Sequence, residues 1–104
     1  MVERVMVVTG GSRGIGAAVA LKAAAAGYAV LVNYAGNAAA AGSVVERIRQ
    51  AGGTADRVRG DVGSEADVEA IFAAADAMGP LSALINNAGV FDQPSLCLLY
   101  TSDA

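Results

Sequence analysis

The sequence predicts one α/β domain with a doubly wound parallel sheet. Short apolar runs rich in β-branched residues alternate with longer alanine-rich segments of helical spacing, and only a few residues separate them. Strands that alternate with helices over short connections form parallel sheets by right-handed crossovers. Hydrophobic residues make up 55% of the 104 residues and charged residues only 16%, which argues against disorder.

The first βαβ unit is predicted over residues 4–34. The segment "RVMVVTG" (4–10) is an apolar run that stops at glycine, and "YAVLVNY" (28–34) is a second such run. Both are typical of buried parallel strands. Between them, "IGAAVALKAAAAG" (15–27) has apolar residues at helical spacing and a glycine at its end, which favours a helix that stops there.

A second helix is predicted over about residues 37–51. Val44, Val45 and Ile48 form its apolar stripe, although Gly42 within it costs about 1 kcal/mol. The segment "ADRVRGDV" (55–62) is then a third short strand.

The last predicted helix is "EADVEAIFAAADAM" (65–78). Ser64 and Asp67 resemble a capping box at its start. The segment "LSALINNAG" (81–89) is a fourth strand that runs into a turn. The most economical arrangement of the four strands is the order 3-2-1-4, the first half of a Rossmann-like sheet.

The charge distribution disfavours nucleic acid as a partner. The net charge is −3, yet no Asp or Glu lies between Arg4 and Val45, so a small anion near the front of the chain is plausible. The longest nearly uncharged run, residues 15–32, is interrupted by Lys22 and by glycines, so we expect no membrane span. With no recognisable signal peptide and a single cysteine, Cys97, a cytoplasmic location is expected.

A glycine-rich segment, "TGGSRGIG" (9–16), joins the first strand to the first helix. Backbone N–H groups and the positive end of a helix can hold a phosphate at this place. The glycines follow the pattern T-G-x-x-x-G-x-G, and an ordinary strand-to-helix turn is the alternative for this motif taken alone.

Two further motifs accompany the glycine-rich segment: "GDV" (60–62) after the third strand and "NNAG" (86–89) after the fourth. The three motifs together resemble the short-chain dehydrogenase/reductase family. The segments "SRGIG" and "VNYAGN" are most similar to 3-oxoacyl carrier-protein reductases and related sugar dehydrogenases. The resemblance covers residues 1 to about 95.

The resemblance implies a set of cofactor-binding residues in three groups. Asp61 would accept a hydrogen bond from the adenine amino group and Val62 would pack on the ring. The alternative for Asp61 is a solvated loop acid or a cap that precedes the helix. The backbone of Asn87, Ala88 and Gly89 would lie beside the cofactor ribose, whereas Asn86 is expected to join neighbouring strands. The pyrophosphate and ribose would be lined by Gly10, Ser12, Arg13, Gly14, Ile15 and Gly16.

NADP(H) is predicted to be preferred over NAD(H). Dinucleotide sites selective for NAD usually carry an acid at the end of the second strand, about 20 residues past the glycine loop. Here that strand ends in "VNYAGN", without an acid. We expect Arg13, Asn33 and Tyr34 around the 2′-phosphate, with a solvent-facing Arg13 as the alternative.

No residue of this chain is predicted to be catalytic, and none to bind a metal. The resemblance implies a catalytic Ser and a Tyr-x-x-x-Lys pair in the complete enzyme. This chain lacks the pair, because none of its three tyrosines has a lysine four residues later. We therefore expect the cofactor-binding half of an NADP(H)-dependent oxidoreductase that reduces a carbonyl or oxidises an alcohol, itself inactive. A non-catalytic dinucleotide-binding module and a fragment without independent function are the alternatives. The resemblance implies a homotetrameric or homodimeric parent enzyme with a small-molecule substrate.

The end of the chain, "SLCLLYTSDA" (95–104), has neither helical nor strand periodicity. Back-translation of "CLLYTSDA" gives a string that resembles the transposase mosaic-end adapter of sequencing libraries. We interpret residues 1–95 as the N-terminal part of a dinucleotide-binding domain and residues 96–104 as an adapter-derived tail, a natural short C-terminus being the alternative. The outer edge of the fourth strand is then expected to lie open.

Overall fold

The computed structural model describes residues 4–10, 14–86 and 97–101. Strands β1 to β4 are parallel and lie in the order β3-β2-β1-β4, which confirms the predicted fold class and strand order. The elements along the chain are β1 (Val5–Thr9), α1 (Gly14–Ala25), β2 (Ala29–Tyr34), α2 (Ala38–Gln50), β3 (Ala55–Arg59), α3 (Glu65–Met78), β4 (Leu81–Asn86) and β5 (Cys97–Thr101).

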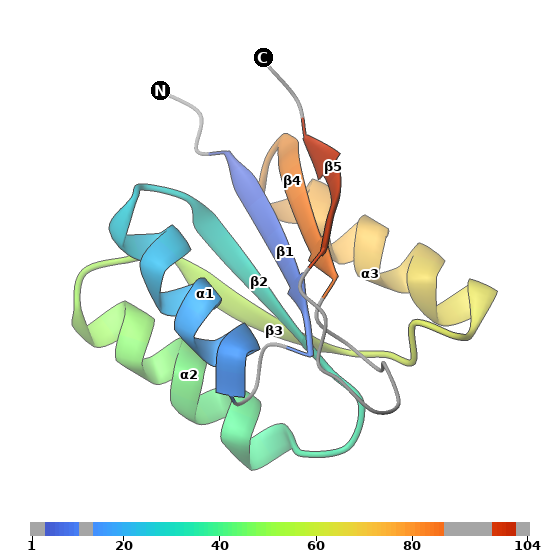
Figure 1. The fold of residues 1–104 in the computed structure, drawn as a ribbon, viewed down its shortest axis with the longest axis horizontal. Coiled ribbons are helices and arrows are strands. Elements are labelled where there is room, and N and C mark those ends of the chain that lie inside the picture. The colour runs from blue at the N-terminus through green and yellow to red at the C-terminus, as the bar shows by residue number, and fades with distance from the viewer. Residues whose placement is uncertain (1–3, 11–13, 87–96, 102–104) are drawn as a thin grey trace.

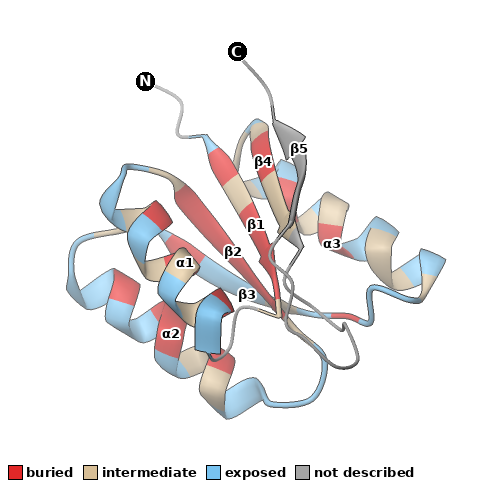
Figure 2. Ribbon diagram, in the orientation of Figure 1, coloured by how far each residue is buried: buried red, intermediate tan, exposed pale blue. Residues whose placement is uncertain are grey.

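The two faces of the sheet bury two separate apolar cores. Helices α1 and α2 cover one face and α3 covers the other (Figure 1). Because side chains alternate along a strand, Val30 and Val32 pack under α1 and α2, whereas Ala29 and Leu31 pack under α3. Figure 2 shows that burial is concentrated on β1 and β2, while the outer surfaces of the helices are exposed.

Gly42 inside α2 makes room for a side chain of the neighbouring strand. A Cβ at this position would lie 2.6 Å from Nη1 of Arg57. That Nη1 donates a hydrogen bond to the carbonyl oxygen of Ala38 in the first turn of α2, at 2.7 Å. The helix-propensity cost of the glycine is therefore offset by a contact that ties β3 to α2.

The start of α3 is capped by Ser64, as predicted, but the capping box is only half formed. The Ser64 hydroxyl accepts a hydrogen bond from the backbone N–H of Asp67 at 3.4 Å. The Asp67 carboxylate accepts instead from the backbone N–H of Asp61, at 2.9 Å. Asp67 thus links the first turn of α3 to the turn that precedes it.

Replacing Ser64 with alanine is expected to lower the free energy of unfolding by about 1 kcal/mol, because the cap at the start of α3 is lost. Urea unfolding followed by far-UV circular dichroism measures this change. Ser43→Ala is the control, since Ser43 is an exposed residue in the interior of α2 with no capping role. Equal stability of the two variants would show that the Ser64 cap does not contribute.

The expectation of an open edge on β4 is wrong. Strand β5 pairs antiparallel with β4, with Leu84 opposite Tyr100 and Asn86 opposite Cys97. An uncovered strand edge presents unpaired N–H and C=O groups, so a following segment gains hydrogen bonds by adding to it. Antiparallel pairing suits a short return, because a parallel partner needs a long crossover. Whether residues 96–104 derive from an adapter stays a prediction.

Candidate functional site

The carboxyl ends of β1, β2 and β3 meet at one edge of the sheet, where α1 begins and the turn before α3 lies (Figure 1). The chain leaves β1 for one face of the sheet and reaches β4 from the other face, so the strand order changes direction between these two strands. Thr9, the last residue of β1, donates its hydroxyl to the Ile85 carbonyl oxygen of β4 at 3.3 Å. In open α/β sheets, ligands bind at such a switch point.

The glycine-rich turn requires glycine at two described positions. Gly10 and Gly14 have φ values of 63° and 62°, in the left-handed region that disfavours other residues. Among the described residues, a Cβ built on Gly14 would meet no atom within 4 Å beyond its chain neighbours and the backbone of its own helix, so the space beside it is open there. Gly16, two residues after Gly14, is buried within α1. Within the described ranges, the first turn of α1 therefore has open space beside Gly14, at the carboxyl end of β1.

Asn33 occupies the buried face of β2 near its end. Its side chain is only 2% exposed, and its Nδ2 donates to the carbonyl oxygens of Val58 at 3.3 Å and Gly60 at 3.1 Å. The amide therefore binds β3 at Val58 and the first residue after β3, Gly60. Asn33 fixes the end of β3, and its predicted contact with a 2′-phosphate stays a prediction.

Three hydrogen bonds hold the turn after β3. The backbone N–H of Gly60 donates to the Tyr34 carbonyl oxygen at 2.9 Å. Asp61 Oδ1 accepts from the backbone N–H of Gly63 at 2.8 Å, and the N–H of Asp61 donates to Asp67. The exposed Asp61 carboxylate is thus fixed in position at the surface.

Two large hydrophobic side chains are exposed among the described residues, and both lie at this edge. Ile15, in the first turn of α1, is 48% exposed, and Val62, after β3, is 38% exposed. Both exposed apolar side chains thus lie at the end of the sheet where ligands bind in folds of this class.

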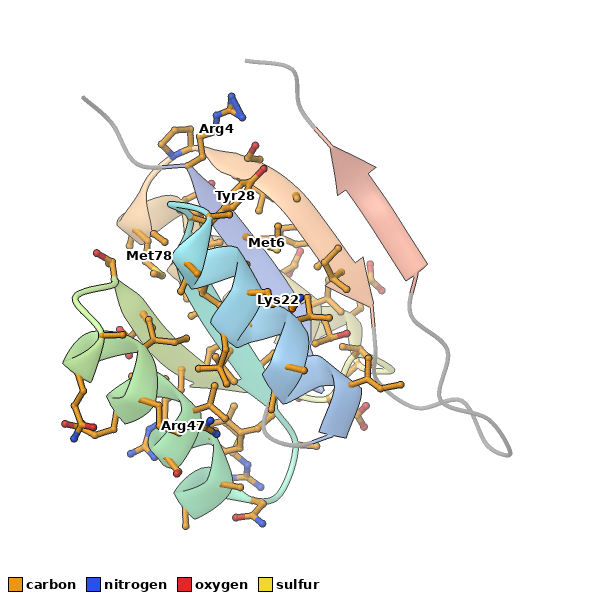
Figure 3. All side chains as sticks on the ribbon, turned by 60° about the vertical axis from the view of Figure 1, so that its left-hand side comes forward. Arg4, Met6, Lys22, Tyr28, Arg47 and Met78 are labelled. Carbon is orange, nitrogen blue, oxygen red and sulfur yellow. The ribbon has the colours of Figure 1, made fainter. Side chains whose placement is uncertain are left out.

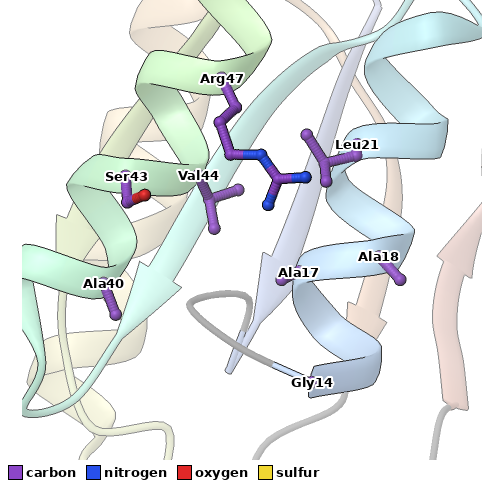
Figure 4. Close-up of a pocket in the computed structure, with 8 residues that line it drawn as sticks. All are labelled: Gly14, Ala17, Ala18, Leu21, Ala40, Ser43, Val44 and Arg47. Carbon is purple, nitrogen blue, oxygen red and sulfur yellow. The ribbon is translucent and has the colours of Figure 1, made fainter.

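Two cavities adjoin this end of the sheet. One of about 360 Å³ is lined by Ala35, Arg59, Gly60, Asp61 and Asp67, at the ends of β2 and β3. The other, of about 440 Å³, separates α1 from α2, and in Figure 4 the Arg47 side chain reaches across it toward Leu21.

The described edge brings together eight of the predicted cofactor-binding residues: Gly10, Gly14, Ile15, Gly16, Asn33, Tyr34, Asp61 and Val62. The other five, Ser12, Arg13, Asn87, Ala88 and Gly89, lie outside the described residues. Arg59 and Asp67 also line the cavity at the ends of β2 and β3, and neither was predicted from the sequence to lie there. Both residues lie close in sequence to the "GDV" motif, and this was the signal that could have identified them. The capping box alone was used to explain Asp67.

Neither acid–base chemistry nor a metal is indicated by the described residues. Lys22 is exposed on α1, whereas Tyr28 precedes β2 at the opposite edge of the sheet, beside Arg4 (Figure 3). In the part of the chain that the structure describes, no group of His, Cys, Asp and Glu side chains is placed to hold a metal ion. None of the helices described is both long and apolar enough to cross a bilayer.

The sequence and the fold are both similar to known proteins. The family model for short chain dehydrogenases matches residues 4–102. The uncharacterized oxidoreductase YgfF of Escherichia coli is 51% identical over 87 residues, which are 83% of this chain and 35% of that protein. The 3-oxoacyl-[acyl-carrier-protein] reductase FabG of Staphylococcus aureus is 42% identical over 84 residues, 80% of this chain and 34% of FabG.

Among solved structures, a dehydrogenase/reductase from Sinorhizobium meliloti superimposes with a TM-score of 0.82 at 40% sequence identity. The match covers 88% of this chain and 36% of that protein. The chain thus spans about a third of the length of the curated relatives it matches.

Proposed function

Because the chain belongs to the short-chain dehydrogenase family, whose members are oxidoreductases that use NAD(P)(H), we propose that it forms the cofactor-binding part of such an enzyme. The whole enzyme would reduce a carbonyl or oxidise an alcohol of a small molecule. Residues that transfer the proton would lie outside this segment, which has no Tyr-x-x-x-Lys. The segment alone would bind cofactor without turnover.

The proposal rests mainly on the exposure of Ile15 and Val62, which lie at the carboxyl ends of the strands, where α1 and the turn before α3 begin. Covering both side chains with a ligand would remove apolar surface from water, which is favourable. A dinucleotide fits this arrangement, since it offers phosphates to the glycine turn and a flat apolar adenine ring to Val62. The open space beside Gly14 and the left-handed turn at Gly10 also suit a closely approaching phosphate.

Each described residue would then have a defined task. Gly10, Gly14 and Gly16 would shape the turn so that backbone N–H groups face the pyrophosphate, with Ile15, Ser12 and Arg13 beside it. Asp61 would accept from the adenine amino group. Asn87, Ala88 and Gly89 would contact the ribose through their backbone. When bound, the nicotinamide of the cofactor supplies or accepts the hydride.

A preference for NADP(H) is part of the proposal. The described end of β2 carries no carboxylate, so nothing on this strand repels a 2′-phosphate. Arg13 would provide the attracting charge, Tyr34 would lie beside it, and Asn33 would hold the neighbouring Gly60 in place through its amide.

Val62→Ser is expected to weaken NADP⁺ binding about fivefold without lowering stability. The side chain is partly exposed, and covering it with the adenine would contribute about 1 kcal/mol. Isothermal titration calorimetry measures the affinity and thermal unfolding the stability; Ile15→Ser should behave in the same way. Ala77→Ser, an exposed change at the far end of α3, is the control. Unchanged affinity in both Val62→Ser and Ile15→Ser would exclude this end of the sheet as the cofactor site.

A further inference from the structure

Arg59 reaches from β3 to the end of β2. It is the last residue of β3 and is paired with Tyr34, the last residue of β2. Its Nε donates to the carbonyl oxygen of Ala35 at 3.4 Å. The guanidinium is thereby held at the carboxyl end of β2, although its own strand is the next one in the sheet.

Arg59 is also the one cation among the described residues that line the 360 Å³ cavity. Two carboxylates share this cavity, and both accept backbone hydrogen bonds: Asp61 from Gly63 and Asp67 from Asp61. No described carboxylate forms an ion pair with Arg59. An anionic group that entered beside two carboxylates would need a fixed cation, and Arg59 is positioned to supply it.

We infer that Arg59 binds the 2′-phosphate of NADP(H) and is a cofactor-selectivity residue of this site. The inference rests on the proposed function, because the end of β2 is where a dinucleotide places its ribose 2′ position. The planar guanidinium has donors left over after its Nε binds Ala35, and these suit a phosphate.

Arg57 provides a matched control on the same strand. It lies two residues before Arg59, on the same face of β3, and is likewise exposed. Its Nη1 also donates to a backbone carbonyl, that of Ala38. It does not line the cavity. The two arginines therefore differ in position and not in charge or in the kind of bond they form.

The test is calorimetric titration of the wild-type chain, Arg59→Ala and Arg57→Ala with NADP⁺ and with NAD⁺. Arg59→Ala is expected to lose about tenfold in affinity for NADP⁺ and less than about twofold for NAD⁺, because only the phosphate contact is removed. Arg57→Ala should leave the ratio of the two affinities unchanged. Adenosine 2′,5′-bisphosphate and AMP, as probes of the adenosine end alone, should show the same difference.

Four outcomes would count against the inference. An equal loss for both cofactors would assign Arg59 a purely structural role, and an unchanged NADP⁺ affinity would assign it none. If Arg57→Ala reduced selectivity as much as Arg59→Ala, general surface charge would explain the preference. A wild-type chain that binds neither cofactor would instead overturn the proposed function, and the role of Arg59 with it.

Discussion

Asn33→Leu is expected to lower the free energy of unfolding by about 2 to 4 kcal/mol. Leucine is similar to asparagine in size and shape but cannot donate, so the carbonyl oxygens of Val58 and Gly60 would lose their shared partner. Each buried acceptor left unpaired costs about 1 to 3 kcal/mol. Urea unfolding followed by far-UV circular dichroism measures the loss.

Cofactor binding should weaken in the same variant, because Gly60 begins the turn that carries Asp61. Gln50→Leu is the control: it removes an exposed amide at the end of α2 and should change stability by less than about 0.5 kcal/mol. Similar stability of Asn33→Leu and the control would mean that the buried amide does not hold β3 in place.

Gly14→Val is expected to weaken NADP⁺ binding more than about 100-fold, the equivalent of about 2.7 kcal/mol. The left-handed φ of 62° strains any residue with a Cβ, at a cost of about 1 to 2 kcal/mol in stability. The effect on NADP⁺ affinity is expected to be larger than the effect on stability. A side chain there would fill the open space beside the helix N-terminus, which the pyrophosphate is proposed to occupy.

Gly27→Val separates backbone strain from lost binding. Gly27 also has a positive φ, of 101°, and open space around it, but it follows the opposite end of α1. This variant should lose comparable stability and keep its NADP⁺ affinity once folded, as measured by calorimetry below the melting temperature. An equal loss of affinity in both variants would attribute the effect to strain and not to the phosphate site.

The core of the fold could be predicted because two strong patterns coincide. The apolar runs of β1 and β2 and the glycine-stopped helices between them permit one economical sheet order, and the structure has it. The helix predicted over residues 65–78 has the same bounds in the structure, since Ser64 and Gly79 mark both ends. These signals come from residues that are close together in the sequence, so they can be identified without the tertiary structure.

The function of individual polar side chains was harder to predict. Asn33 was grouped with Tyr34 at the end of β2, yet the alternation along a strand places Asn33 on the same face as the buried Leu31. Asp67 matches a capping-box position, but its carboxylate binds the N–H of Asp61, a choice set by the path of the preceding turn.

Strand β5 could not be predicted from periodicity. Its formation depends on the free edge of β4, a tertiary feature, and on a short return that permits antiparallel pairing. Arg59 illustrates the same limit at the site. Its charge is evident in the sequence, but its reach to Ala35 follows from the pairing of β2 with β3.

The most direct test of the central claim is calorimetric titration of the unmodified chain with NADP⁺ and NAD⁺ under identical conditions. We expect saturable binding of both at one site, with NADP⁺ bound about tenfold more tightly, because β2 carries no acid and Arg59 favours the 2′-phosphate. Tighter binding of NAD⁺, or binding of neither, would contradict it.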